Sequence, residues 1–191
     1  MRNTKVRLLV ESAVMIALGY VLSTIPIMQM PFGGKVTLLS MLPIVLIAVK
    51  NGPVWGFATA FCYSLTQLAS SGVFGWGLTP TILGGAILLD YLVAFTVLGI
   101  AGVFGKTRTG AIGGTALACV LRFLSHFASG VILWANYEQF VVFGKEWVGK
   151  PVLYSLCYNG AYMLPELIFT VVGMAALVNV PQIKKLLGLT K

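Results

Sequence analysis

Long runs of apolar residues recur along this 191-residue chain, and they constrain its fold more than any other feature. About 20 apolar residues in a helix cross the roughly 30 Å hydrocarbon core of a membrane, where every backbone polar group needs a partner within the protein. Only 9% of the residues are charged, against about 25% in an ordinary soluble domain. The sequence therefore predicts an all-α integral membrane protein in which residues 1–191 form a single transmembrane domain.

Six stretches are predicted to be transmembrane helices. We place them near residues 7–28, 36–50, 53–70, 79–105, 110–135 and 152–180. The second is short for a span, and we expect either a kink at Pro43 or a locally thinned or tilted arrangement to absorb the difference. The first contains Glu11 and lacks a cleavage pattern of small residues, which favours a span over a signal peptide.

The basic residues predict the orientation of these spans, because cytoplasmic loops carry an excess of Lys and Arg. If both termini are cytoplasmic, nine basic residues face inward, three face outward and Arg122 lies within the fifth span. The nine are Arg2, Lys5, Arg7, Lys50, Lys106, Arg108, Lys184, Lys185 and Lys191, and the three are Lys35, Lys145 and Lys150. This topology accounts for the net charge of +8, so the lipid bilayer is the expected partner and nucleic acid is not.

Residues that carry common catalytic chemistry are sparse. The stretch "GKTRTG" at 105–110 resembles the end of a phosphate-binding loop, but Ile100 occupies the position that requires glycine, and a membrane helix precedes it instead of a strand. One histidine and three scattered cysteines form no recognisable metal cluster or nucleophile motif. We therefore expect no enzyme, no metal site and no resident cofactor.

Four ionisable residues lie inside the predicted spans, namely Asp90, Arg122, His126 and Glu166. Such residues are costly in a membrane and usually face the bundle interior or a water-filled cavity. We expect Arg122 and Glu166 to pair, and this pairing could serve only to hold helices together. His126 alone would favour an ordinary core histidine.

The neighbours of His126 change that interpretation. Arg122, His126, Gly130 and Trp134 recur every four residues and so share one helix face. Gly130 leaves a gap between an imidazole and an indole, where a flat ring could approach the backbone. Trp134 could instead be an interfacial anchor near the end of a span, but the four residues together favour a ligand.

Depth in the membrane gives an independent indication. At about 1.5 Å per residue, Asp90 lies roughly 15 Å and His126 roughly 13 Å below the outer edge. Tyr154 and Asn159 fall in the outer half of the last span. Together with Trp134 they would supply a carboxylate, an imidazole, a phenol, an amide and an indole, which suit a cationic, nitrogen-rich aromatic solute.

Two outer connections are candidate lids over this pocket. "MQMPFGGK" offers Phe32 beside glycines, and "SSGVFGWG" offers Phe74 and Trp76. Aromatic residues at this depth are equally typical of interfacial loops.

Four separated segments, in order along the chain, carry a resemblance to a known family. They are "VRLLVESAVMIALGYVLSTIP", "LLDYLVAFTVLGIAGVF", "LRFLSHFASGVILW" and "LYSLCYNG". In them the chain resembles the thiamine-specific S components of energy-coupling factor (ECF) transporters. The resemblance implies a six-helix subunit of the bacterial cell membrane that binds thiamine, its transported ligand, with high affinity. It also implies import with an ECF module of one transmembrane coupling protein and two ATPase subunits.

The resemblance also implies roles for single residues. The ligand-binding set it implies is Asp90, Tyr91, His126, Gly130, Trp134, Tyr154 and Asn159. Asp90 replaces a glutamate of the family and is one methylene shorter, so a bridging water or a shifted ligand is expected. Glu166 stands where the family suggests an uncharged residue, and Phe32 imperfectly replaces an aromatic residue of the first outer connection.

A pair of small residues in the first span matches the family's contact site for the coupling protein. These are Ala13 and Ala17, four residues apart. Small residues let helices approach closely in lipid, so without the resemblance they would indicate ordinary packing within the bundle.

Other functions remain open at this point. A self-sufficient, proton-coupled secondary transporter for a cationic heteroaromatic solute could use Asp90, His126 or Glu166, although no clear internal repeat is present. An intramembrane enzyme would turn over a substrate, and a structural scaffold would bind no small molecule.

Overall fold

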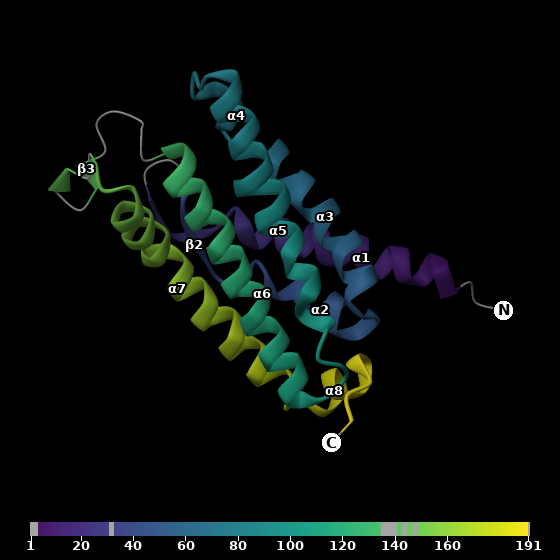
Figure 1. Ribbon diagram of the computed structural model, residues 1–191. Coiled ribbons are helices and arrows are strands. Elements are labelled where there is room, and N and C mark those ends of the chain that lie inside the picture. Colours follow the sequence, from purple (N-terminus) through teal and green to yellow (C-terminus); the bar gives the residue numbers. More distant parts are fainter. Residues whose placement is uncertain (1–3, 31–32, 135–140, 143–144, 147–148, 191) are drawn as a thin grey trace.

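A computed structural model describes residues 4–30, 33–134, 141–142, 145–146 and 149–190, which form a bundle of tilted helices (Figure 1). The α-helices are α1 (Thr4–Ser23), α2 (Leu42–Asn51), α3 (Pro53–Ala69), α4 (Pro80–Ala86), α5 (Ala94–Thr96), α6 (Arg108–Ser129), α7 (Pro151–Leu177) and α8 (Pro181–Leu187). Two π-helical segments, η3 (Ile87–Val93) and η5 (Gly130–Trp134), and two 3₁₀ segments, η2 (Val73–Gly75) and η4 (Val97–Gly102), complete the helical part. Figure 1 shows α6 and α7 side by side, with α1 running across the bundle.

Within the part of the chain that the structure describes, four helices are long and apolar enough to cross a membrane. They cover Thr4–Ser23, Pro80–Gly102, Arg108–Trp134 and Pro151–Leu177, and each corresponds to one of the predicted spans. The other two predicted spans are shorter, since α2 has 10 residues and α3 has 17. The structure adds α8, which follows the last predicted span and was not predicted.

The bundle is all-α as predicted, but the predicted boundaries of the first two spans were wrong at the connection between them. Residues 24–28 and 36–41, assigned to spans one and two, lie outside the helices; β1 (Pro26–Gln29) pairs there with β2 (Lys35–Thr37) in an antiparallel hairpin. Pro26 has no backbone N–H and cannot extend α1, whereas the two strands supply hydrogen bonds to each other. A second small hairpin, β3 (Val141–Val142) with β4 (Lys145–Glu146), lies in the connection between η5 and α7.

The short helix α2 lies inside the bundle. Pro43 is in its first turn, where a missing N–H costs no hydrogen bond, so it starts the helix and the predicted kink was wrong. Seven of its residues are buried, namely Leu42, Pro43, Ile44, Val45, Ile47, Ala48 and Val49. A helix covered on most sides by protein does not need the length of a lipid-facing span.

Two π-helical segments occur in neighbouring spans and are joined by a hydrogen bond between Trp134 and Asp90. The segment η3 contains Asp90, and η5 runs from Gly130 to Trp134. A π-turn accommodates one extra residue, which rotates the side chains that follow around the helix axis. The insertions therefore set the directions of Asp90 and Trp134, which the four-residue spacing alone did not determine.

Backbones touch where α3 crosses η4. A Cβ atom added to Gly99 would lie 2.6 Å from the carbonyl carbon of Gly56, closer than real Cβ atoms approach. Because backbone atoms cannot move aside as a flexible side chain does, this crossing requires glycine.

We predict that Gly99→Ala lowers the free energy of unfolding by about 1–3 kcal/mol through overpacking. Thermal unfolding of the detergent-purified protein would measure the loss. The matched control is Gly84→Ala in α4, where an added Cβ meets no atom within 4 Å. Equal melting temperatures for the two variants would contradict the close contact.

Candidate ligand-binding pocket

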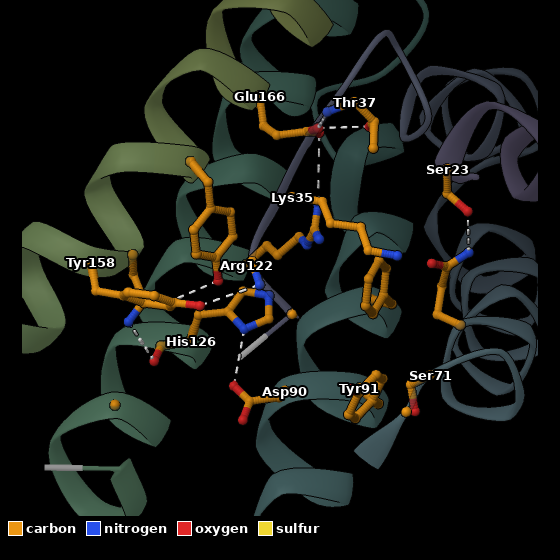
Figure 2. Close-up of a pocket in the computed structure, with 18 of the residues that line it drawn as sticks. Ser23, Lys35, Thr37, Ser71, Asp90, Tyr91, Arg122, His126, Tyr158 and Glu166 are labelled. Atoms are coloured by element: carbon orange, nitrogen blue, oxygen red, sulfur yellow. Dashed lines mark hydrogen bonds and ion pairs between the residues drawn. The ribbon is translucent and has the colours of Figure 1, made fainter. Parts of the chain in front are cut away.

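A cavity of about 170 Å³ lies between the β1–β2 hairpin, the ends of α1 and α3, the η3 segment, α6 and α7. Figure 2 shows Asp90, His126, Arg122 and Glu166 in succession along it. All seven residues predicted to bind a ligand line this cavity, namely Asp90, Tyr91, His126, Gly130, Trp134, Tyr154 and Asn159.

The carboxylate of Asp90 is held by three donors from the opposite helix. His126 Nδ1 lies 3.0 Å from Oδ1, while Ser129 Oγ and Trp134 Nε1 donate to Oδ2 at 2.6 and 3.1 Å. A carboxylate oxygen accepts hydrogen bonds, so the tautomer of His126 that carries its proton on Nδ1 donates in this contact. Ser129 was missed by the sequence analysis, although it lies three residues after His126 on the same face.

The imidazole of His126 has aromatic rings on two sides. Phe95 and Tyr162 both meet it edge-on, with ring centroids 6.5 and 5.8 Å away. With Nδ1 engaged by Asp90, the ring has a fixed orientation in the cavity wall. A fixed imidazole of this kind presents a defined surface to a flat ligand.

Gly130 brings α6 and α7 into contact. A Cβ added there would lie 3.0 Å from Asn159 Nδ2 and would clash with Ser155. The space left by the missing side chain therefore faces α7, where Asn159 Nδ2 donates to the carbonyl oxygen of His126 at 3.1 Å. Gly130 also lines the cavity, but Ser155 and Asn159 fill the space beside its Cα, so the missing side chain allows the close approach of α7.

Three tyrosines form a stripe on the cavity side of α7. Tyr154, Tyr158 and Tyr162 are buried and spaced four residues apart; Tyr154 and Tyr158 stack with centroids 5.6 Å apart. Tyr162 donates to Asn159 Oδ1 at 2.9 Å, and the amide of Gly34 in the hairpin donates to the Tyr158 hydroxyl at 3.3 Å. The sequence analysis selected only Tyr154, although the same spacing was available as a signal for the other two.

The candidate lid residues have different positions. Trp76 lines the cavity and meets Trp134 edge-on at 5.9 Å between ring centroids, with Gly33 of the hairpin beside it. Phe74 is 62% exposed and is not among the residues that line the cavity. Phe32 lies outside the described residues. Of the candidate lid residues that the structure describes, Trp76 is therefore the one in place to cover the pocket.

The cavity ends in Arg122 and Glu166, which we call the inner pair. Arg122 Nη1 lies 3.9 Å from Glu166 Oε2, which confirms the predicted pairing. Glu166 Oε1 accepts from the amide and the hydroxyl of Thr37 at the end of β2. The Arg122 guanidinium lies 4.3 Å from the centre of the Phe95 ring. The inner pair thus joins α6, α7 and the hairpin.

Comparisons with known proteins place the chain in a family. Residues 9–185 match the family model described as "Thiamine transporter protein". The chain belongs to this family. It is 29% identical over 185 residues to the thiamine transporter ThiT of Bacillus subtilis strain 168, with 88% of each chain covered. It is 27% identical over 157 residues to ThiT of Lacticaseibacillus paracasei, with 75% and 73% covered.

A solved structure supports the fold independently. ThiT from Listeria monocytogenes superposes with a TM-score of 0.74 at 24% identity, covering 97% of this chain and 99% of that one. Family membership and the four long apolar helices make the chain a multi-pass protein of the bacterial cell membrane. The family is one of transporters, in agreement with the expectation of a protein that is not an enzyme.

We predict that Arg122→Gln and Glu166→Gln each lower the melting temperature, because each leaves the other charge buried without its partner. The loss of unfolding free energy in the double variant should be smaller than the sum of the losses in the two single variants, with a coupling free energy of about 1 kcal/mol. A thermal unfolding series on the four proteins measures this difference. Strictly additive losses would mean that the 3.9 Å contact contributes nothing.

Proposed function

We propose that this protein captures thiamine from outside the cell in the described pocket and imports it as the S component of an ECF transporter. The observation that carries the proposal is the Asp90 carboxylate, held at membrane depth by His126, Ser129 and Trp134 in a chain of the thiamine transporter family. Thiamine is a fixed cation with two aromatic rings, which matches a buried carboxylate set among aromatic side chains.

Each residue of the pocket then has a chemical task. Asp90 balances the positive charge of the thiazolium ring, and three donors still leave its carboxylate accepting capacity, because two oxygens offer about four lone-pair sites. His126 and Trp134 provide surfaces for the rings. Tyr154 and Asn159 form hydrogen bonds with the aminopyrimidine, and Tyr91 completes the wall beside Asp90. Trp76 closes over the ligand from the outer side.

The proposed topology has six spans and cytoplasmic termini. The α2 and α3 helices add two short crossings, since α2 is shielded by protein and α3 is only slightly shorter than a standard span. The last turn of α2 carries Lys50, whose Nζ lies 2.7 Å from Glu11 Oε2 in α1. The excess of basic residues on that side supports its assignment to the cytoplasm.

Import requires the partner subunits, because binding alone moves nothing across the membrane. We propose that Ala13 and Ala17 form part of the contact with the coupling protein. Both are exposed on α1, where Val10 and Val14 are also exposed, so this face is available for a second membrane protein. The two ATPase subunits would supply the energy for reorientation.

Titrating the detergent-purified protein with thiamine should quench its tryptophan fluorescence saturably, and a panel of other vitamins should not. We predict that Trp134→Ala weakens binding about tenfold or more through lost ring contact, and that Asp90→Asn weakens it roughly 10- to 100-fold through the lost charge. The matched control is Trp55→Ala in α3, whose Nε1 donates to Ser12, away from the pocket.

Calorimetry would check any variant whose fluorescence is silent. Normal affinity in both pocket variants would remove Trp134 and Asp90 from the site.

Uptake assays in cells with and without the ECF module separate the proposal from a secondary transporter. Uptake that persists without the module would favour the proton-coupled alternative.

A further inference from the structure

The stretch "GKTRTG" at 105–110, which resembles the end of a phosphate-binding loop, has no role in the proposed function. Its basic residues Lys106 and Arg108 are exposed at the end of the bundle where α8 lies (Figure 1). In α8, Lys185 is exposed as well and Lys184 is half-buried. We call these four residues the basic surface.

Contacts between the last residues of the chain and the start of α6 hold the basic surface together. The amide and the hydroxyl of Thr190 donate to the carbonyl oxygen of Lys106 at 2.8 and 3.0 Å. The Lys106 side chain reaches the end of α8, since a Cβ added to Gly188 would lie 3.9 Å from Lys106 Cδ. Leu187 and Leu189 are buried in the hydrophobic core and anchor α8 beside this connection. Two segments far apart in the sequence therefore bring their cations to one place.

In the described part of the chain, the basic surface has no acidic partner. Residues 91–137 and 167–191, which include all four cations, contain no Asp or Glu. The carboxylate of Glu11 is engaged elsewhere, by Arg7 and Lys50. Like charges that are held together without countercharges attract an anionic group from outside the protein.

The basic surface lies at the ends of membrane-spanning helices. The connection with Lys106 follows the span that ends at Gly102, and α8 follows the span that ends at Leu177. Phe104 and Leu186, close to the cations in sequence, are 56% and 46% exposed. Exposed apolar side chains beside basic ones suit the boundary between lipid headgroups and acyl chains. A soluble anion would use the cations alone.

Orientation of the spans does not require this arrangement. Basic residues orient a membrane protein from any position near the ends of its spans, so they need no contact with one another. The bonds of Thr190 and the burial of Leu187 and Leu189 instead fix two basic segments side by side. A fixed cluster of cations suits one bound headgroup.

We propose that the basic surface binds the phosphate of an anionic phospholipid, while Phe104 and Leu186 contact its acyl chains. The bound lipid holds this end of the bundle against the headgroup layer. The proposal goes beyond the function proposed above and does not depend on thiamine binding.

Native mass spectrometry of the full-length, detergent-purified protein without thiamine tests the proposal. The protein is titrated with phosphatidylglycerol, whose headgroup is anionic, and with phosphatidylcholine of the same acyl chains, whose headgroup has no net charge. We expect the Kd of phosphatidylglycerol to be lower by about fivefold or more, because each cation near the headgroup favours the anionic lipid.

The variants divide the basic surface into its two segments. Lys184→Gln with Lys185→Gln changes α8, and Lys106→Gln with Arg108→Gln changes the connection before α6. Each pair should lower the ratio of the two Kd values by about half or more, and the variant with all four changes should bind both lipids about equally. Either pair gives a result if the other prevents folding.

The matched control is Lys5→Gln with Lys150→Gln, which removes two exposed charges outside the basic surface and should keep the preference. An equal loss of preference in this control would overturn the proposal, because net charge alone would then explain it. Equal affinities of the wild type for the two lipids would also overturn it, and so would a preference that survives all four changes.

A competition separates a lipid site from a site for free anions. Glycerol phosphate, a soluble fragment of the headgroup, should not displace phosphatidylglycerol from the wild type at equal concentration, because it lacks the acyl chains. Displacement would overturn the lipid assignment. Since thiamine is absent throughout, failure of this proposal and failure of the proposed function are separate results.

Discussion

The structure depends on satisfying buried polar groups where no bulk water is available. At membrane depth an unpartnered carboxylate is costly, and Asp90 meets this requirement with donors from His126, Ser129 and Trp134. These contacts join η3, which contains Asp90, to the end of α6 and to η5. The π-helical segments on both sides follow from the same requirement, because they turn Asp90 and Trp134 toward each other.

The same scarcity of polar groups explains why much of the site could be predicted from the sequence. Polar residues are so rare in the predicted spans that each one carries information, and counting residues from the ends of the spans gave their depth. Asp90, His126, Trp134 and Asn159 were expected to meet, and they line one cavity. The pairing of Arg122 with Glu166 followed from the cost of a lone buried charge.

Other parts of the structure lacked a signal of this strength. Tyrosines are common at membrane interfaces. The recurrence of Tyr154, Tyr158 and Tyr162 every four residues was therefore not distinctive within an apolar helix. The sequence of the β1–β2 hairpin is apolar, so it was assigned to the ends of the two flanking helices. Pro26 and the Gly33-Gly34 turn were the sequence features that favoured a hairpin. The π-turns have no recognisable sequence pattern; they arise from tertiary contacts.

The close crossing of α3 and η4 has a mechanical consequence. Where backbones touch, as at Gly56 and Gly99, two helices cannot slide or separate without breaking contacts along a rigid edge. The opposite end of the bundle is built from a hairpin, a tryptophan pair and helices with inserted residues. The contact of Gly56 with Gly99 therefore restricts relative movement of α3 and η4 at this crossing, away from the residues that line the cavity.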